Sequence, residues 1–460
     1  MNIVKTIIEA IKGTETDYTK GDINRAIILL SIPMIIEMLG ESLFSIVDAY
    51  YVSQVSNEAF ATVILTETVS TIIYSLAIGI SIAATALVAR RIGEKKPKQA
   101  AEAAAQSILI ALAISFIITL VGLFYSSEIL AIMGATPAVI EQGLLYTQII
   151  IGFNLIIMLL FILNGIFRGA GDAAMAMRAL WVANILNLIL DPILIFGWGP
   201  FPELGVVGAA VATTIGRGLA VCFQLYILFK GSSIIKLTRA YFKPKVALLK
   251  KLINISITGA GQHIISSASW IFLMYIVAQY GTDVVNGYGL AIKYIVLAIL
   301  PAWGIANAGA TLMGQNLGAK QPDRASKSVW LAALYNGILL MIVAAIYFFY
   351  AEPLIRLFNT DPEVVAVGVE SLKIFSLGYV AYGVAMVINQ AFSGAGDTRT
   401  PTYINIFTFW IVQIPLAYYL STILDWGPTG VYWAVISSET MMMFICIWLF
   451  HRGSWRTVEV

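Results

Sequence analysis

Acidic side chains inside apolar stretches are the residues of this sequence best suited to chemistry. Glu37, Glu41 and Asp48 lie in one apolar block, and Asp191 lies in another. A carboxylate in hydrocarbon is costly, and such residues commonly serve ion or proton movement. Glu37, Glu41 and Asp48 are separated by 4, 7 and 11 residues, which on a helix places them within roughly 40° of one another. We therefore expect one acidic stripe that faces protein or an aqueous cavity rather than lipid.

The second acid, Asp191, has neighbours suited to binding a cation. Pro192 follows it, removing an amide donor and disturbing the local helix. Asn187 lies one turn earlier, and Thr213 reaches a similar depth in the next block. Two carboxylates with amide and hydroxyl neighbours suit a proton relay or a hard cation with oxygen ligands. The alternative is that hydrogen bonds within the bundle merely satisfy both acids. The sequence predicts an H⁺ or Na⁺ site at Asp48 and Asp191, no other metal site and no bound cofactor.

Other charges in apolar blocks favour a structural interpretation. Glu67 could pair with Arg217, and Lys293 with Glu439. A lone charge within a helix bundle is expensive, so pairing is the expected arrangement. His263 is interpreted as a core histidine.

The elements that carry these residues are membrane helices. The chain has 460 residues, of which 59% are hydrophobic and 12% charged, whereas soluble domains have about a quarter of their residues charged. Apolar blocks of about 20 residues or more recur along it, and each must cross the bilayer as a helix that satisfies its own backbone. We predict an all-α polytopic membrane protein with twelve transmembrane helices. Its basic residues are spread over short loops, so no nucleic-acid partner is expected.

Lysine and arginine are retained on the cytoplasmic side of membranes, and their distribution predicts the orientation. They occupy alternate loops, to which Arg168 and Arg178 are assigned, and the intervening loops hold only Arg356. Both termini are therefore expected in the cytoplasm. The predicted segments are 1–25 (with a possible interfacial helix), an N-lobe at 26–229, a linker at 230–251, a C-lobe at 252–450 and a tail at 451–460.

An internal repeat divides the chain. At an offset of 225 residues, the segment 164–172 (NGIFRGAGD) matches 389–397 (NQAFSGAGD). Each copy has six spans, so the copies enter from the same side and form two pseudo-symmetric six-helix lobes, as in some rocking carriers. Asp48 maps onto Leu273 and Asp191 onto Leu416, which makes both acids special to the N-lobe. The Gly-Ala-Gly-Asp loops lack a preceding strand and a following Gly-Lys, so we interpret them as helix ends with a capping Asp rather than phosphate cradles.

Several segments together resemble the multidrug and toxic compound extrusion (MATE) family over nearly the whole chain. They are Ser31–Pro33, Asp48–Ser53, Ala89–Gly93, Asn164–Asp172, Leu190–Pro192 and Gly205–Ala210. The resemblance implies two V-shaped lobes and export of amphipathic, often cationic compounds by Na⁺ or H⁺ antiport.

The resemblance is greatest to the DinF-like and archaeal branch, and it implies roles for particular residues. Asp48, Asp191, Asn187 and Thr213 match the pattern implicated in cation coupling, and Glu41 occupies a polar position of the same cavity. Asn164 and Glu37 are candidates for the substrate cavity. Phe44 and Phe161 join them at positions where similar proteins carry polar side chains, which removes possible cation ligands.

The leading hypothesis is a secondary active multidrug exporter, a cation/drug antiporter that works by alternating access. The alternative is a flippase for lipid-linked saccharides, which would favour a basic cavity. No nucleophile or Asp-rich metal motif supports a membrane enzyme. We expect a monomer in the plasma membrane whose partners are amphipathic small molecules and membrane lipids.

Overall fold

The computed structural model describes residues 3–13, 16–231 and 233–458, and these contain helices and no strands. Twelve helical segments are long and apolar enough to cross a membrane, which confirms the predicted number of spans. The first six are α2 (Ile23–Ser53), α3 (Asn57–Gly93), α4 (Pro97–Ile132), α5 with α6 (Pro137–Gly152 and Asn154–Ala170), α7 (Ala173–Phe196) and α8 (Val206–Lys230). The second six are α9 (Val246–Ala278), α10 (Thr282–Gly318), α11 (Pro322–Phe349), α13 (Pro362–Ala395), the run α14–η2–α15–η3 (Arg399–Asn405, Ile406–Gln413, Ile414–Tyr418 and Tyr419–Ile423) and α16 (Pro428–Arg452).

Four short helices complete the fold: α1 (Ile3–Lys12), η1 (Arg239–Phe242), α12 (Ala351–Arg356) and η4 (Ser454–Thr457). The connection between α8 and α9 includes η1, and α9 begins within the segment predicted as linker. The element α1 is a helix in a segment for which an interfacial helix is predicted; its placement at a membrane surface stays a prediction.

The two Gly-Ala-Gly-Asp loops end one helix and begin the next, as interpreted from the sequence. Gly171 and Gly396 end α6 and α13 with φ values of 90° and 92°, a conformation that glycine adopts without steric cost. The Asp172 side chain then accepts a hydrogen bond from the amide of Met175, and that of Asp397 accepts one from Thr400. The loops are therefore paired helix caps.

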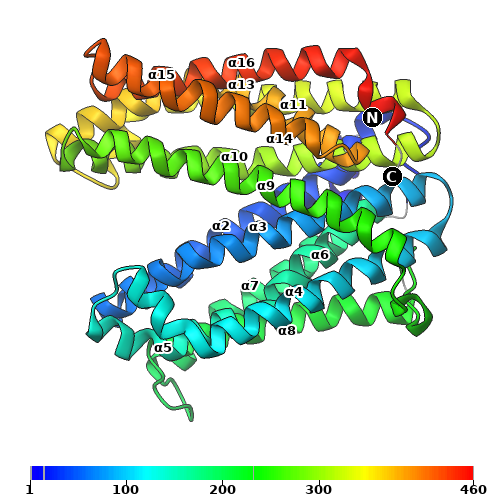
Figure 1. The fold of residues 1–460 in the computed structure, drawn as a ribbon, viewed down its shortest axis with the longest axis horizontal. Helices are drawn as coiled ribbons and strands as arrows, with labels where there is room; N and C mark the ends of the chain where they lie inside the picture. The colour runs from blue at the N-terminus through cyan, green and yellow to red at the C-terminus, as the bar shows by residue number, and fades with distance from the viewer. Residues whose placement is uncertain (1–2, 14–15, 232, 459–460) are drawn as a thin grey trace.

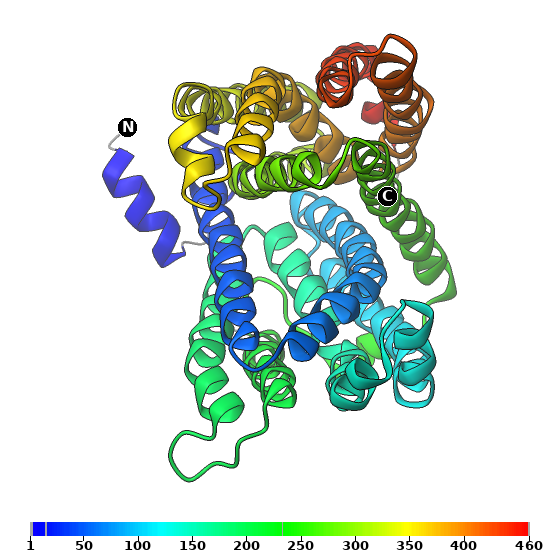
Figure 2. The same cartoon turned by 90° about the vertical axis from the view of Figure 1, so that its left-hand side faces the viewer.

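The helices form two groups that diverge from the end where the chain termini lie (Figure 1). One group is α2–α8 and the other is α9–α16, and the view from the open end shows them as separate bundles (Figure 2). Contact between the groups is made chiefly by two helix pairs, α3 with α9 and α2 with α10. The molecule is thus a V that is closed on the side of the termini.

Glycines at equivalent positions of the repeat allow the close approach at the closed side. A Cβ on Gly79 would lie 2.3 Å from the carbonyl oxygen of Ser256, and one on Gly304 would lie 2.7 Å from the amide nitrogen of Ile35. Nearer the ends of α3 and α10, a Cβ on Gly93 would lie 2.0 Å from the carbonyl oxygen of Gln315. Its counterpart Gly318 would meet the carbonyl oxygen of Arg90 at 2.1 Å. Because Arg90 and Gln315 are themselves equivalent at the 225-residue offset, the lobes meet across a pseudo-twofold axis.

The N-terminal segment and the C-terminal tail also join the lobes on this side. Asp17 forms an ion pair of 2.8 Å with Lys95 of the N-lobe, while Arg324 of the C-lobe donates to the carbonyl oxygens of Tyr18, Lys20 and Gly21. In the tail, the carbonyl oxygen of Val458 accepts a hydrogen bond from Arg90. The closed side is therefore held by helix packing and by two chain ends.

Candidate functional site

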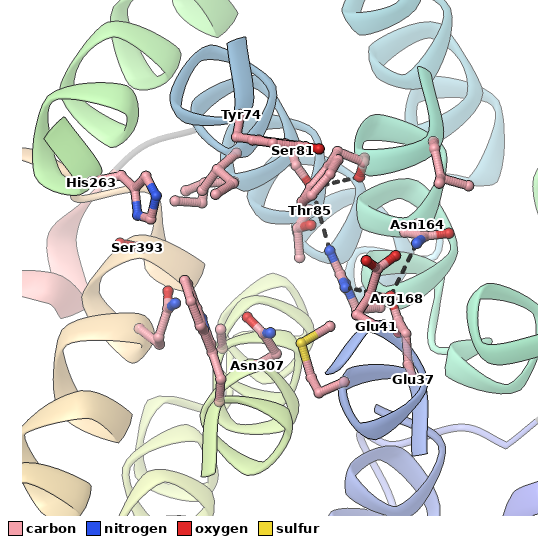
Figure 3. A pocket seen from close by; sticks show the side chains of 18 of the residues that line it. Glu37, Glu41, Tyr74, Ser81, Thr85, Asn164, Arg168, His263, Asn307 and Ser393 are labelled. Carbon is pink, nitrogen blue, oxygen red and sulfur yellow. Dashed lines mark hydrogen bonds and ion pairs between the residues drawn. The ribbon is translucent and has the colours of Figure 1, made fainter. Parts of the chain in front are cut away.

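A cavity of about 330 Å³ lies between the two lobes (Figure 3). Its N-lobe wall includes the charged and polar side chains predicted for it, and its C-lobe wall is uncharged apart from the titratable His263. The N-lobe polar residues are Glu37, Glu41, Thr71, Tyr74, Ser81, Thr85, Asn164 and Arg168, and those of the C-lobe are His263, Trp303, Asn307, Gln390 and Ser393. The cavity brings together residues from both halves of the chain.

Glu37 is the centre of one hydrogen-bonded network in the N-lobe wall. Its Oε1 accepts from Asn164 and from Arg168, each at 3.0 Å, and the side chains of Glu37 and Arg168 are 1% and 11% exposed. The side-chain oxygen Oδ1 of Asn164 accepts a hydrogen bond of 2.6 Å from Gln224, and Arg168 also donates to the hydroxyl of Ser81. Figure 3 shows Glu37, Asn164 and Arg168 converging on one wall.

The assignment of Arg168 to a cytoplasmic loop is wrong. Arg168 lies in the last turn of α6 and lines the cavity, where it neutralises Glu37. Counting lysine and arginine assigns a basic residue at the edge of an apolar block to a loop. Its long side chain can nevertheless extend from the helix end into the protein interior. Arg168 was therefore missed as a residue of the site in the analysis of the sequence.

The second arginine, Arg217, pairs with Glu41 rather than with Glu67. Its Nη2 lies 3.4 Å from Glu41, its Nη1 lies 3.4 Å from the Tyr74 hydroxyl, and its guanidinium lies 4.8 Å from the centre of the Phe44 ring. The predicted partner, Glu67, is exposed on α3. Glu41 and Phe44 are neighbours on α2, so together they offer Arg217 a carboxylate and an aromatic face.

The predicted pair of Lys293 and Glu439 is also wrong. Among the residues that the structure describes, no ion pair joins them: Lys293 is exposed on α10, while Glu439 is 8% exposed inside the C-lobe. Glu439 lines a small cavity with Tyr379 and Tyr382. One side chain is therefore exposed and the other buried, a difference that the sequence positions did not reveal.

Asp48 on α2 and Asp191 on α7 are both buried in the N-lobe, and their assignment as an ion site stays a prediction. Asp48 is 8% exposed and Asp191 fully buried, and their carboxyl groups are near enough to interact electrostatically. Asp191 accepts a hydrogen bond of 3.0 Å from Asn187, whose amide group also donates to Thr213 at 3.2 Å. One oxygen of each carboxyl, Oδ1 of Asp48 and Oδ2 of Asp191, is buried without a hydrogen-bond partner. A proton or a small cation would satisfy such an unpartnered acceptor.

The acid pair lies apart from the lining of the large cavity. Neither Asp48 nor Asp191 is among its lining residues, but Arg217 connects the two regions because it interacts electrostatically with Asp48 and bonds to Glu41 of the cavity wall. The chain thus has a substrate-sized cavity and, behind its N-lobe wall, a compact acidic site.

The two predicted phenylalanines differ in position. Phe161 lines the cavity, and its ring centre lies 5.7 Å from that of Tyr74. Phe44 lies under the Arg217 guanidinium and is not among the lining residues. Phe44 packs against Arg217 and Phe161 against Tyr74, and neither phenylalanine has an oxygen atom that could bind a cation.

The C-lobe wall is the part of the site that sequence reasoning missed. His263 lines the cavity with Trp303, its ring centre 6.2 Å away, so its interpretation as a core histidine is wrong. The internal repeat could have indicated which C-lobe residues line the cavity. Glu37 and Glu41 map onto Gln262 and Ser266, which flank His263 in α9.

Twelve membrane helices in two lobes around a shared cavity define a membrane transporter rather than an enzyme. The chain belongs to the MatE family, whose model matches residues 33–193 and 260–419, once in each lobe.

Curated relatives are similar along almost their whole length. "Probable multidrug resistance protein NorM" of Thermotoga maritima is 26% identical, with 94% of this chain and 93% of the relative covered. A "FAD transporter" of Shewanella oneidensis is also 26% identical, with 94% and 95% covered. Among solved structures, an outward-facing conformation of a multidrug resistance MATE family transporter has a TM-score of 0.90 at 26% identity, covering 97% of this chain and all of the other.

A further solved structure belongs to a transporter of the MOP superfamily from Pyrococcus furiosus. It has a TM-score of 0.89 at 26% identity, with 96% of this chain and 98% of the other covered. For that protein, reverse polarity of the binding pocket is said to suggest a different function.

Proposed function

We propose that this protein is a cation-coupled exporter of amphipathic, cationic small molecules that works by alternating access. The observation that carries the proposal is the pair Asp48 and Asp191, two neighbouring buried carboxyl groups that each keep one oxygen without a partner. Binding of H⁺ or Na⁺ there removes the cost of two close negative charges in low dielectric. Asn187 and Thr213 provide further oxygen atoms for a cation.

Coupling requires that the ion bind the two facing states of the transporter with different affinity. The chain from Asp48 to Arg217 to Glu41 supplies a physical link between the acidic site and the cavity wall. Neutralising Asp48 weakens its attraction for Arg217, which leaves Arg217 more strongly held by Glu41. The substrate that competes for Glu41 is then released more easily.

A substrate with negative charge is less well matched to this cavity. Its lining holds two carboxylates, those of Glu37 and Glu41, and one guanidinium, that of Arg168. Arg168 is already paired with Glu37, and the nearby Arg217 with Glu41. A phosphorylated lipid, or a nucleotide such as that named for the relative from Shewanella oneidensis, would meet a lining with more carboxylates than guanidinium groups, so we favour cationic cargo over the flippase alternative.

The V shape suits an outward-facing state of a carrier that has both termini in the cytoplasm. Its closed side is the side of the termini, so a cytoplasmic position of the termini places the opening outside. We propose this orientation, together with residence in the plasma membrane and a monomeric working unit that contacts membrane lipids along its length.

Purified protein in liposomes tests this proposal. Uptake of ethidium is measured under separately imposed Na⁺ and proton gradients, with a membrane-impermeant quencher reporting orientation. We expect accumulation under one of the two gradients and loss of that accumulation in Asp48→Asn. The matched control is Ser53→Ala near the end of the same helix, where an exposed hydroxyl bonds only to its own helix. Normal gradient-driven uptake by Asp48→Asn would overturn the coupling role, and flipping of a phosphorylated lipid without ethidium flux would favour the alternative.

A further inference from the structure

A second cavity, of about 130 Å³, adjoins the large one on the C-lobe side. The two cavities are neighbours, because Ile78, Ile82, His263, Trp303 and Gln390 line both of them. The lining of the second cavity is rich in neutral amides and large apolar side chains. The amides are Gln262, Asn389, Gln390 and Asn405, and the apolar side chains include Trp303, Phe409, Met386 and Met442.

These amides are only partly satisfied by the protein. Asn405 is 9% exposed, and its Oδ1 is buried without a hydrogen-bond partner. Within the described part of the chain, the side chain of Asn389 forms hydrogen bonds to two sulfur atoms, Met442 Sδ at 3.9 Å and Cys446 Sγ at 3.7 Å, and sulfur is a weak partner. Amide groups in a bundle core are costly without partners. A ligand with hydrogen-bonding groups would satisfy them.

The repeat places this pocket opposite the charged network of the N-lobe. At the 225-residue offset, Glu37 corresponds to Gln262, Arg168 to Ser393, and Arg217 to Met442. Asn164, bonded to Glu37 in the N-lobe, corresponds to Asn389. At these equivalent positions the C-lobe therefore carries neutral side chains where the N-lobe carries ionised ones.

We propose, resting on the proposed export function, that the C-lobe pocket binds the planar heteroaromatic part of a substrate while the N-lobe wall binds its cationic part. The indole of Trp303 and the ring of Phe409 offer flat apolar surfaces, and the methionines adapt to differing outlines. The amides of Asn405 and Gln390 bond to ring nitrogens or amino groups. Gln262 is anchored by its hydrogen bond of 2.9 Å to the carbonyl oxygen of Thr398, which gives the pocket a fixed edge.

The test compares two cations that differ in hydrogen-bonding capacity. Ethidium is planar and carries two amino groups, whereas tetraphenylphosphonium is not planar and has no hydrogen-bond donor. Dissociation constants and transport KM values are measured for both with the full-length protein. For Asn405→Leu we expect ethidium binding to weaken about fivefold, the effect of losing one hydrogen bond, and tetraphenylphosphonium binding to stay within twofold. Gln390→Leu serves as a second variant with the same expectation.

Thr408→Val is the matched control in the same span. Thr408 is fully buried with an unpartnered hydroxyl, as Asn405 has an unpartnered amide oxygen, but it does not line the pocket. We expect this variant to bind both cations normally. Equal weakening of both cations by Asn405→Leu and Gln390→Leu, or no effect on either, would overturn the C-lobe subsite. Failure of the wild-type protein to transport either cation would instead overturn the export function on which the subsite depends.

Discussion

The N-lobe and the C-lobe have the same fold but different chemistry at equivalent positions. In the N-lobe, Glu37 and Glu41 hold Arg168 and Arg217 in ion pairs. At the equivalent positions, the C-lobe carries Gln262, Ser266, Ser393 and Met442. The glycine contacts that bring the lobes together are kept in both copies, at Gly79 with Gly304 and at Gly93 with Gly318.

Packing between the lobes requires matching residues in both copies of the repeat, whereas the proposed ion site requires particular residues in only one copy. Packing at the closed side depends on both lobes equally, because a symmetric contact fails if either surface changes. An ion site needs only one location, and a second set of buried charges would add desolvation cost without benefit. Variants at equivalent positions of the two lobes test this difference.

The largest effect is expected from removing a coupling acid. Asp191→Asn should reduce gradient-driven uptake at least tenfold, because the amide cannot take up a proton and binds a cation more weakly. Glu439→Gln, which changes the buried acid of the C-lobe, should leave coupling to the gradient intact. The ratio of imposed gradient to accumulated substrate, measured in proteoliposomes, distinguishes the two. Equal loss in both variants would show that ion chemistry is shared by the lobes.

The next effect concerns the ion pair of Glu37 and Arg168. Arg168→Met leaves a buried carboxylate without its cation, which should lower the free energy of unfolding by about 3 kcal/mol. The double variant Glu37→Gln/Arg168→Met removes both charges and should recover most of that loss. Ser393→Met, at the equivalent C-lobe position, provides the comparison, and thermal unfolding in detergent measures all three. The idea fails if the double variant is no more stable than Arg168→Met.

A moderate and symmetric effect is expected at the glycine contacts. Gly93→Ala and Gly318→Ala each place a methyl group against a carbonyl oxygen of the other lobe, at a cost of about 1 to 3 kcal/mol. Both substitutions should weaken closure on the side of the termini, because the steric cost arises only in the conformation in which the lobes touch there. Spin labels at positions 98 and 327 report the separation of the lobes there. Unchanged distances in both variants would show that these contacts do not hold the closed state.

The smallest effect is expected at the ion pair of Asp17 and Lys95, outside the membrane-spanning segments. Burial by itself raises the pKa of Asp17, but bonds from Lys95 and Thr19 outweigh it and lower the pKa to about 2. A carboxyl with a lowered pKa stabilises the fold above its usual pKa, so this contribution is constant at neutral pH and disappears as pH falls from about 4 towards 2.

Because the Asp17–Lys95 pair is exposed, its contribution should be about 0.5 kcal/mol. Lys95→Met should show this loss in thermal unfolding at pH 7 and low salt. Lys320→Met, at the equivalent position of the repeat, should show none. An equal loss in both would mean that the ion pair with Asp17 is not its cause.

Much of the fold could be predicted from the sequence because the membrane imposes simple rules. Helical spans follow from apolar length, and the repeat follows from matched turns such as 164–172 and 389–397. Within the candidate site, the proximity of Asp48, Asp191, Asn187 and Thr213 was also predictable. Asn187 and Asp191 lie one turn apart on α7, and depth in the bilayer brings Thr213 level with them.

The partners of the arginines could not be predicted in the same way. Helical periodicity states which residues share a face, but not how neighbouring helices are rotated towards one another. The sequence led to Glu67 as the partner of Arg217, whereas the packing of the helices places Glu41 and Phe44 beside it. Lys293 and Glu439 failed to pair for the same reason.

By itself, the sequence determined that this chain crosses the membrane twelve times, that it is a duplication, and that its N-lobe carries an unusual concentration of buried acids. Those properties depend on composition, spacing and offset, which are local or linear quantities. The tertiary structure was needed to show which carboxylates are neutralised by arginine, which keep an oxygen without a hydrogen-bond partner, and that neutral C-lobe side chains line the shared cavity. Such properties depend on the rotation and crossing of helices far apart in the chain, and on side-chain reach of a few ångströms.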